Sequence, residues 1–344
     1  MGAWNTDSGA SIHAELLGRE WVKAGHQIFV FTFFKHSIHG TAITNKDEDY
    51  VIRCFTNSKH PKIKLDPLPF LKNDYDFFIV EDLGMLPLDP LGKIFHWIKR
   101  KAKTINVIHD GDLSKVPSFY QFNWDAVVGF DERYIEFLKK AYPSELLHKI
   151  PFPCHPPILG NKKNTRMKLK LPLEKKIIFM FGYAARIGVK IIPWILKLCS
   201  DYPIHILIVS EDEIAITKGR RYSRIGDIEV REGVMSISQL YDYLHASDAL
   251  IFNKSSQPHV VVSSTILQCM GSGCPIIARD SNAIENFRGE ILKFKSQKEF
   301  KDCLTDVLEQ KKRYKSTLKN VENYVLNNSS KVVAERFINL FNKL

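Results

Sequence analysis

The feature that most constrains the fold is a series of short apolar segments that alternates with helical patterns twice along the chain. In the first half, β-branched or aromatic runs occupy residues 27–33, 51–56, 76–80, 104–110 and 126–130. In the second half, similar runs occupy residues 176–182, 205–210, 227–232, 248–253 and 275–278. Amphipathic patterns such as 11–25, 131–142 and 236–247 separate these runs. Short strands that alternate with helices favour parallel sheets covered by helices. The sequence therefore predicts an α/β protein with two Rossmann-like, doubly wound domains.

The two series are separated by a proline-rich stretch, IPFPCHPPILG, that starts at Ile150. Proline interrupts strands and helices alike, so we place the domain boundary between residues 150 and 172. At the other end, only residues 1–4 precede the first glycine-containing turn. Either the first strand is very short or the true start of the protein lies upstream.

Composition and charge narrow the class of protein. The 344 residues are 44% hydrophobic and 25% charged, as in soluble globular proteins. No secretory signal, 18-residue apolar run or CxxC pair is present, which predicts a cytoplasmic protein without disulfides or a zinc site. The net charge of +11 favours an anionic partner such as a membrane surface or a phosphorylated substrate, although a solvated lysine-rich surface explains it equally well. Zinc-finger spacing, an RNP-like strand and a basic tail are missing, so we expect no nucleic-acid partner.

Several motifs carry a family resemblance through their order and spacing. They are SGASIH (8–13) with KAGH (23–26), VIHD (107–110), IPFP (150–153), LY (240–241) with SDALIF (247–252), and LQCMGSGCPIIA (267–278). Together they resemble the retaining glycosyltransferase family four, also called glycosyl transferases group 1. The resemblance implies the GT-B fold, in which two Rossmann-like, doubly wound domains face a cleft. It assigns an acceptor-side domain to 1–155, a linker to 156–172, a nucleotide-sugar-binding domain to 173–328, and a final helix at 329–344 that packs back on the N-terminal domain.

The resemblance also implies an activity and a set of site residues. The activity is the retaining transfer of a hexose from a nucleoside diphosphate sugar to a glycan, lipid-linked or small-molecule acceptor, without a cofactor or a metal. The catalytic residue would be His109, and the acceptor-side candidates are Glu81 and Asp110. The donor-binding residues would be Gly9, Gly182, Arg186, Lys190, Val234, Ser263, Ser264, Thr265 and Gln268.

The chain departs from the family where donor binding is concerned. Two glutamates that the family places eight positions apart fall here on Val260, where we expect the helix to start, and on Gln268. Tyr183 stands at the position of a diphosphate-binding arginine, which leaves Arg186 and Lys190 as replacements. These losses favour an alternative: a non-catalytic GT-B module that binds a sugar, a nucleotide or a partner transferase. Other GT-B chemistry, such as that of epimerases and phosphorylases, is a further alternative.

Individual residues have simpler interpretations beside the functional ones. His109 follows a strand, where open α/β sheets bind ligands, but it could also be a structural histidine. We interpret His13 as a packing residue on its helix. Asp110 and Asp112 form an Asp-x-Asp pattern, a metal motif of a different glycosyltransferase fold and a weak signal by itself. Glu81 and Asp82 follow a strand as well, where one carboxylate would serve as a base or cap a helix.

The segment at 90–103 predicts a basic amphipathic helix. Ile94, Trp97 and Ile98 share one face, and lysines and an arginine cover the rest. Such a helix suits the surface of an anionic membrane, which would make the protein peripheral on the inner face of the membrane. The same apolar stripe would equally pack on a Rossmann sheet.

Overall fold

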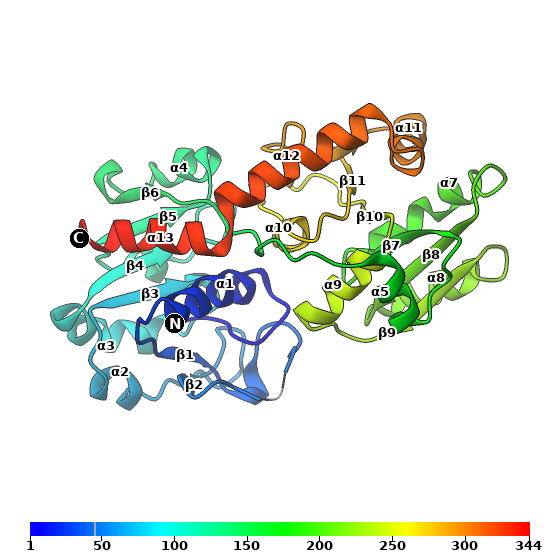
Figure 1. Ribbon diagram of the computed structural model, residues 1–344. Helices are drawn as coiled ribbons and strands as arrows, with labels where there is room; N and C mark the ends of the chain where they lie inside the picture. The colour runs from blue at the N-terminus through cyan, green and yellow to red at the C-terminus, as the bar shows by residue number, and fades with distance from the viewer. Residues whose placement is uncertain (45) are drawn as a thin grey trace. The chain divides into compact units, whose positions relative to one another are not determined.

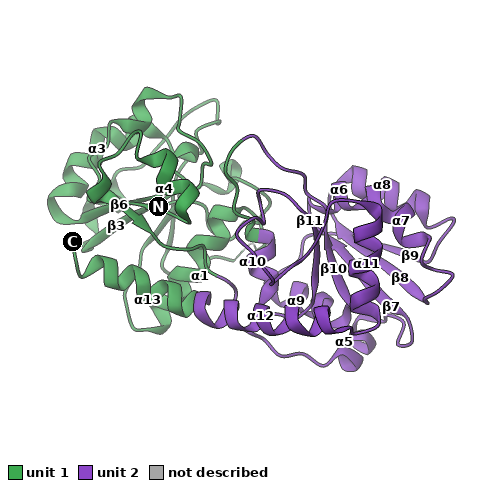
Figure 2. Ribbon diagram, turned by 90° about the horizontal axis from the view of Figure 1, so that it is seen from above, with its two compact units in different colours: residues 1–153, 259–264, 330–344 green, residues 154–258, 265–329 purple. Residues whose placement is uncertain are grey.

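The computed structural model describes residues 1–44 and 46–344 and divides them into two compact units, coloured separately in Figure 2. Unit 1 comprises Met1–Pro153, His259–Ser264 and Ser330–Leu344. Unit 2 comprises Cys154–Pro258 and Thr265–Ser329. Each unit has a parallel sheet with helices, so the α/β class is confirmed.

Unit 1 is built on two parallel sheets, with strand orders β3-β4-β5-β6 and β1-β2. Its helices and strands are α1 (Gly9–Lys23), β1 (Val30–Phe33), η1 (Lys35–Ser37), β2 (Val51–Phe55), α2 (Leu68–Lys72), β3 (Phe77–Glu81), η2 (Leu83–Met85), α3 (Leu88–Lys101), β4 (Lys103–Val107), η3 (Pro117–Tyr120), β5 (Ala126–Gly129), α4 (Glu132–Leu138), η4 (Ser144–Leu146), β6 (Leu147–Lys149) and α13 (Ser330–Phe341). The first residues of the chain bridge the sheets. The backbone N–H of Gly2 donates to the carbonyl of Phe31 in β1, and the nitrogen of Met1 donates to the carbonyl of Ile79 in β3.

Helix α13, at the end of the chain, lies beside α1 in unit 1 (Figure 1). The indole Nε1 of Trp21 donates to the backbone carbonyl of Ala334 at 3.3 Å. The ring of Trp21 also packs against Phe337 and Phe341, with centroid distances of 6.0 and 5.8 Å. Aromatic pairs at such distances add stability beyond the area that they bury.

Unit 2 has a sheet with strand order β12-β11-β10-β7-β8-β9, all parallel. Its elements are α5 (Lys162–Leu169), β7 (Lys176–Phe181), α6 (Ala185–Gly188), η5 (Val189–Ile191), α7 (Ile192–Leu196), β8 (Ile204–Ser210), α8 (Glu213–Tyr222), β9 (Ile228–Glu232), α9 (Ile237–Ala246), β10 (Ala249–Phe252), α10 (Ser264–Met270, whose first residue groups with unit 1), β11 (Ile276–Arg279), β12 (Leu292–Phe294), α11 (Gln297–Leu308) and α12 (Lys312–Asn328). The chain enters at β7 in the middle, moves outward to β9, and returns to β10 on the other side of β7. This is the doubly wound order, and it places a topological switch point between β7 and β10.

The prediction that a helix starts near Val260 is wrong. Helix α10 begins at Ser264, and the valines before it are not helical. The backbone N–H of Val260 instead donates to the carbonyl of Gly111 in unit 1. Three consecutive β-branched residues lose side-chain freedom in a helix, so an extended course is favoured for Val260, Val261 and Val262.

Helix α3 corresponds to the predicted basic helix at 90–103. Its apolar side is buried in unit 1, with Leu91, Ile94, Phe95 and Ile98 in the core. Trp97 remains 49% exposed. The apolar stripe is therefore used for packing. No helix in the described part of the chain is long and apolar enough to span a bilayer.

The segment predicted as a linker at 156–172 contains a fixed helix. Arg166, on α5, is buried, and its guanidinium donates to the Ala246 carbonyl and to Oδ2 of Asp248 at 2.8 and 2.6 Å. It also donates to the carbonyls of Leu173 and Lys175, both at 2.9 Å. Asp248 accepts a further hydrogen bond from the backbone of Ile177 in β7. Arg166 therefore ties α5 to the sheet of unit 2.

This arrangement makes Arg166→Met strongly destabilising. The substitution leaves buried carbonyls without a donor and leaves Asp248 with only the exposed Lys162 as a cationic partner, at 2.9 Å, which we expect to cost about 3 kcal/mol. We expect the free energy of unfolding, measured by urea denaturation, to fall by that amount. Arg224→Met, at an exposed arginine, is the matched control and should change it by less than about 0.5 kcal/mol. Equal effects of the two substitutions would contradict the role assigned to Arg166.

Candidate functional site

Three polar side chains meet at the carboxyl edge of the sheet in unit 1. Glu81 ends β3, His109 follows β4, and His13 projects from α1. Oε2 of Glu81 lies 2.8 Å from Nε2 of His109 and 3.0 Å from Nδ1 of His13. One carboxylate therefore binds two imidazoles that come from different elements. His13, which we had interpreted as a packing residue, is fully buried and belongs to this cluster.

The charge of Glu81 determines which ring nitrogens carry protons. Burial by itself would raise the pKa of Glu81, but the imidazoles of His13 and His109 outweigh it and lower the pKa to about 2. An ionised carboxylate only accepts hydrogen bonds. His13 therefore carries its proton on Nδ1, and His109 carries one on Nε2. In the neutral form of His109, Nδ1 is left as a hydrogen-bond acceptor.

Aromatic rings surround the two imidazoles. The ring of Phe130 lies 5.2 Å from that of His13 and 5.0 Å from that of His109. Phe152 packs edge-on against both histidines. Burial lowers the pKa of His13, so its ring stays neutral at pH values where a free histidine would already be protonated. Nε2 of His13 has no hydrogen-bond partner among the residues that the structure describes. These rings keep water away from one side of the cluster and fix the orientation of His109.

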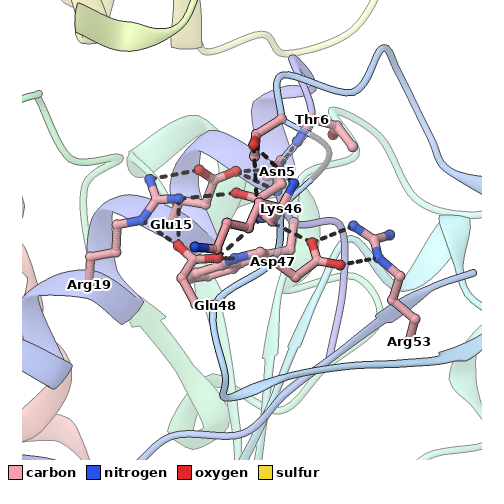
Figure 3. A network of polar contacts seen from close by, with 11 residues as sticks. Asn5, Thr6, Glu15, Arg19, Lys46, Asp47, Glu48 and Arg53 are labelled. Carbon is pink, nitrogen blue, oxygen red and sulfur yellow. Dashed lines mark hydrogen bonds and ion pairs between the residues drawn. The ribbon is translucent and has the colours of Figure 1, made fainter. Parts of the chain in front are cut away.

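The loop before α1 is held by a network of charged and polar groups (Figure 3). Glu15 accepts from the backbone N–H of Asn5 at 2.8 Å and from the hydroxyl of Ser11 at 2.6 Å. Arg19 binds Glu15 and Glu48, at 2.8 and 2.9 Å. Asn5 itself has a positive φ of 58°, a conformation that surrounding structure must hold in place. The network thereby fixes the path of the chain into Gly9.

The segment His259–Ser264 belongs to the same unit and lies against this edge. A Cβ on Gly9 would come 3.1 Å from Oγ of Ser264, so the two predicted donor-binding residues are neighbours. A Cβ on Gly111 would come 1.8 Å from the carbonyl of Val260, so this close approach requires glycine. Ser263, also predicted, is buried in the segment. The structure therefore brings Gly9, Ser263 and Ser264 together at the edge that holds His109.

Two further carboxylates lie beside His109. A Cβ on Gly84 would lie 2.8 Å from Oδ2 of Asp110 and 3.7 Å from Oδ1 of Asp82, so both carboxylates face one small space. Burial, together with the nearby Asp110 and Glu81, raises the pKa of Asp82 to about 6, although His109 opposes this shift. Desolvation also raises the pKa of Asp110, even though the residue as a whole is exposed. Asp82 has a positive φ of 60°, which is unusual for a non-glycine residue.

The remaining donor-binding candidates lie in unit 2. Gly182 follows β7 with a positive φ of 59°, and its carbonyl accepts from the hydroxyl of Ser210 at 2.9 Å. Tyr183 is 70% exposed, and Arg186 donates to its hydroxyl at 3.3 Å. Arg186 also lies 3.7 Å from Asp212. Lys190 is exposed in η5. The turn after β7 thus keeps Arg186 beside Tyr183, the residue that stands at the position of the diphosphate-binding arginine in the resembled family.

Three other predicted residues are spread over unit 2. Gln268 is half-buried in α10, and its carbonyl accepts from the hydroxyl of Tyr241 at 2.9 Å. Thr265 is in the first turn of α10. Val234 follows β9, the edge strand of the sheet, so it lies two strands away from β7. Val234 is therefore separated from Gly182 and Arg186 along the sheet.

The same cluster in unit 1 has the composition of a metal site. Within residues 1–44 and 46–344, the group of possible ligands that lie within 4.8 Å of one another is His13, Glu81 and His109. Asp110 and Asp112 are not part of it. Direct hydrogen bonds of 2.8–3.1 Å already join the three side chains. We therefore interpret them as a hydrogen-bonded cluster that fixes His109.

The fold has clear relatives among solved structures, although the sequence matches no protein-family model. Sucrose-phosphate synthase from Thermosynechococcus elongatus matches with a TM-score of 0.66 at 13% identity, over 98% of this chain and 93% of that one. The catalytic domain of starch synthase IV from Arabidopsis thaliana, bound to ADP and acarbose, matches at 0.65 and 11%, over 99% and 98%. A glycosyltransferase from Rickettsia africae matches at 0.63 and 14%, over 100% and 96%. The chain thus has the GT-B fold, as the sequence motifs predicted.

The buried histidine predicts a specific pH dependence of stability. On unfolding, His13 is released to take up protons near its ordinary pKa of 6.5, whereas in the folded protein its lowered pKa keeps it neutral. The unfolded state then binds more protons, so stability is lost as the pH falls below 6.5. Glu81 adds a similar loss only below its ordinary value of 4.5.

We expect His13→Gln to flatten the decrease in the free energy of unfolding between pH 6.5 and 5, measured by urea denaturation at each pH. His96→Gln, at an exposed histidine on α3, serves as the control and should leave the slope unchanged. A slope in the His13 variant equal to that of the wild type would show that His13 is not a buried neutral group.

Proposed function

We propose that this protein is a retaining glycosyltransferase that moves a hexose from a nucleoside diphosphate sugar to a hydroxyl of a glycan, lipid-linked or small-molecule acceptor. The observation that carries the proposal is the fixed His109 in unit 1, the unit in which Gly9 and Ser264 contact each other, on a GT-B fold. The relative from Arabidopsis thaliana was solved with ADP, which is the leaving group that such a reaction would produce. The proposal extends this chemistry to the present chain.

In the proposed mechanism, unit 1 supplies the groups that face the sugar. Nδ1 of His109 accepts a hydrogen bond from a donor-sugar hydroxyl, because Glu81 holds the proton on Nε2. The hydroxyl of Ser264 and the backbone beside Gly9 offer further donors. Groups that are fixed before the substrate arrives need no reorganisation during the reaction.

The acceptor is proposed to bind through Asp82 and Asp110. Glu81 is buried and already accepts from two imidazoles, so its role is to position His109 and it does not serve as the acceptor-side base. Asp82, with its pKa raised to about 6, is better suited to accept a hydrogen bond from an acceptor hydroxyl near neutral pH. In a retaining transfer, the departing diphosphate takes the proton from the acceptor, so no metal or cofactor is required.

A non-catalytic GT-B module that binds a sugar, a nucleotide or a partner transferase is the second candidate. It is favoured by the exposed Tyr183 and the non-helical Val260, which stand at the positions of a family arginine and glutamate. The two functions differ in one measurable respect. Only the transferase releases nucleoside diphosphate from a nucleotide sugar in the presence of an acceptor, whichever ligand the non-catalytic module binds.

The test combines turnover and binding. We expect the purified protein to release nucleoside diphosphate from at least one donor in a panel of nucleotide sugars offered with sugar acceptors, also in the presence of EDTA. His109→Ala should lower kcat by about 100-fold, the order of magnitude for losing one group that stabilises the transition state. Its affinity for the nucleoside diphosphate should stay unchanged, and His96→Ala should behave as the wild type.

Three results would contradict this assignment. Nucleotide binding without turnover for any donor would identify the non-catalytic module. Equal losses in turnover and nucleotide affinity for His109→Ala would place His109 outside the reacting centre. Loss of activity in EDTA, restored by a divalent metal, would assign a metal-dependent reaction.

We further propose that the protein attaches peripherally to the cytoplasmic face of an anionic membrane through α3. The apolar stripe is buried, which leaves Trp97 with Lys93 and Arg100 on the exposed side of α3, and Lys103 is exposed at the start of β4, just after the helix. Lys99 pairs with Asp125 at 2.9 Å and is not available. A half-exposed tryptophan among basic residues suits the headgroup region of a bilayer.

Sedimentation with vesicles of increasing anionic lipid content tests this attachment. Replacing Lys93, Arg100 and Lys103 by glutamine should abolish sedimentation at low salt, since each basic residue near such a surface contributes about 1 kcal/mol. A control triple variant on α12, at the exposed Lys312, Lys315 and Lys319, should sediment as the wild type does. Equal sedimentation of both triple variants, or none of the wild type, would exclude α3 as the docking site.

A further inference from the structure

The switch point of unit 2 lies between the carboxyl ends of β7 and β10. Doubly wound sheets bind their ligands outside this edge, where the two neighbouring strands send their connections to opposite sides. Gly182 follows β7, and Asn253 and Lys254 follow β10. Lys254 is therefore a basic residue at the position in the fold where a nucleotide would be held.

The backbone on both sides of Lys254 is fixed. Asn253 is buried, and its Nδ2 donates to the carbonyl of Ile187 at 3.1 Å. On the other side, the N–H of Gln257 donates to Oδ1 of Asn282 at 3.0 Å, and Nδ2 of Asn282 donates back to the carbonyl of Gln257 at 2.9 Å. The loop thus presents Lys254 from a defined position.

The ammonium group of Lys254 has no counter-ion within the described chain. The residue is half-buried, and it takes part in no ion pair or hydrogen bond with another described residue. Burial lowers the pKa of Lys254. Holding a partly desolvated ammonium without an anion costs stability, because its charged form is less favourable there than in water. A bound anion would remove that cost.

The two arginines near this edge, Arg186 and Arg279, already interact with side chains of unit 2. Arg186 donates to the Tyr183 hydroxyl at 3.3 Å and lies 3.7 Å from Asp212. Nε of Arg279, at the end of β11, donates to Oδ1 of Asn253 at 2.7 Å, and its guanidinium lies over the ring of Phe294 at 5.4 Å. Both side chains therefore have partners inside unit 2, in contrast to Lys254.

We propose that Lys254 is the cation that binds the diphosphate of the nucleotide sugar, in place of the arginine whose family position is occupied by Tyr183. This inference rests on the proposed function and adds a binding residue to it. An ammonium is a compact point charge that suits phosphate oxygens. As the bond between the sugar and the diphosphate breaks, negative charge grows on the diphosphate, and a fixed cation would stabilise it.

Titration calorimetry with Lys254→Gln tests the proposal. Isothermal titrations would use ADP, UDP and GDP, and the matching nucleosides as probes without phosphate. A lost charge-assisted hydrogen bond should weaken nucleoside diphosphate binding by about 10- to 100-fold and leave nucleoside binding unchanged. Lys254→Arg should retain most of the affinity, and Lys218→Gln, at an exposed lysine on α8, should match the wild type.

A stability measurement separates binding from a structural role. Without nucleotide, Lys254→Gln should unfold at the same or a higher urea concentration than the wild type, since it removes an uncompensated charge. A lower unfolding midpoint together with weaker binding of nucleosides and nucleoside diphosphates alike would overturn the inference, because Lys254 would then act on the fold.

The remaining outcomes distinguish this inference from the proposed function. Wild-type affinity of Lys254→Gln for the nucleoside diphosphate would overturn the role of Lys254 and leave the transferase proposal standing. A wild-type protein that binds none of the nucleotides would overturn both.

Discussion

The site in unit 1 depends on one buried carboxylate that two imidazoles share. Glu81 lies at the end of β3, and the hydrogen bonds from His13 and His109 keep it ionised where burial alone would protonate it. A buried charge is tolerated only when it is paired and hydrogen-bonded. The carboxylate in turn fixes both tautomers, so that His109 presents an acceptor nitrogen. Removing Glu81 would therefore change the chemistry of His109 as well as its position.

The candidate site in unit 2 contains a lysine that is unpaired within the described chain instead of a hydrogen-bonded carboxylate. Its sheet supplies a switch point between β7 and β10, and its polar network through Asn253 holds Arg279 and the end of α6. The half-buried Lys254 remains without a counter-ion among the described side chains. An uncompensated cation lowers stability, and such costs are found mainly at binding sites, which supports the role proposed for Lys254. The two units thus contribute in different ways, one through a fixed histidine and the other through an unpaired cation.

Much of the fold could be predicted from the sequence. Long apolar runs such as that of β8 identify buried parallel strands, and the predicted segments all contain a strand. The strands β6 and β12 were missed because they are only three residues long. The helical period of residues 260–271 predicts a start of α10 that is four residues too early. The hydrogen bond between Val260 and Gly111 keeps Val260 out of the helix, and such a long-range contact is not visible in a local pattern.

Two signals in the sequence predicted candidate site residues: the family motifs and a position after a strand. His109 has both signals, Gly9 and Ser264 come from the motifs alone, and the strand rule applied to β10 also indicates Lys254. His13 and Glu81 could not be paired in advance, because 68 residues separate them and only the packing of α1 on the sheet brings them together. The raised pKa of Asp82 depends likewise on burial, which the sequence does not encode locally.

The proton that Glu81 is expected to hold on Nε2 of His109 can be observed directly. Long-range 1H–15N correlation spectra of the histidine-labelled protein distinguish protonated from unprotonated ring nitrogens. We expect that near neutral pH the neutral form of His109 carries its proton on Nε2 and that Nδ1 is unprotonated, with His13 neutral and protonated on Nδ1. We also expect the Nδ1 resonance of His109 to shift when the nucleotide sugar binds. A neutral His109 that carries its proton on Nδ1, or a tautomer that is unchanged in Glu81→Leu, which removes the acceptor, would contradict this assignment.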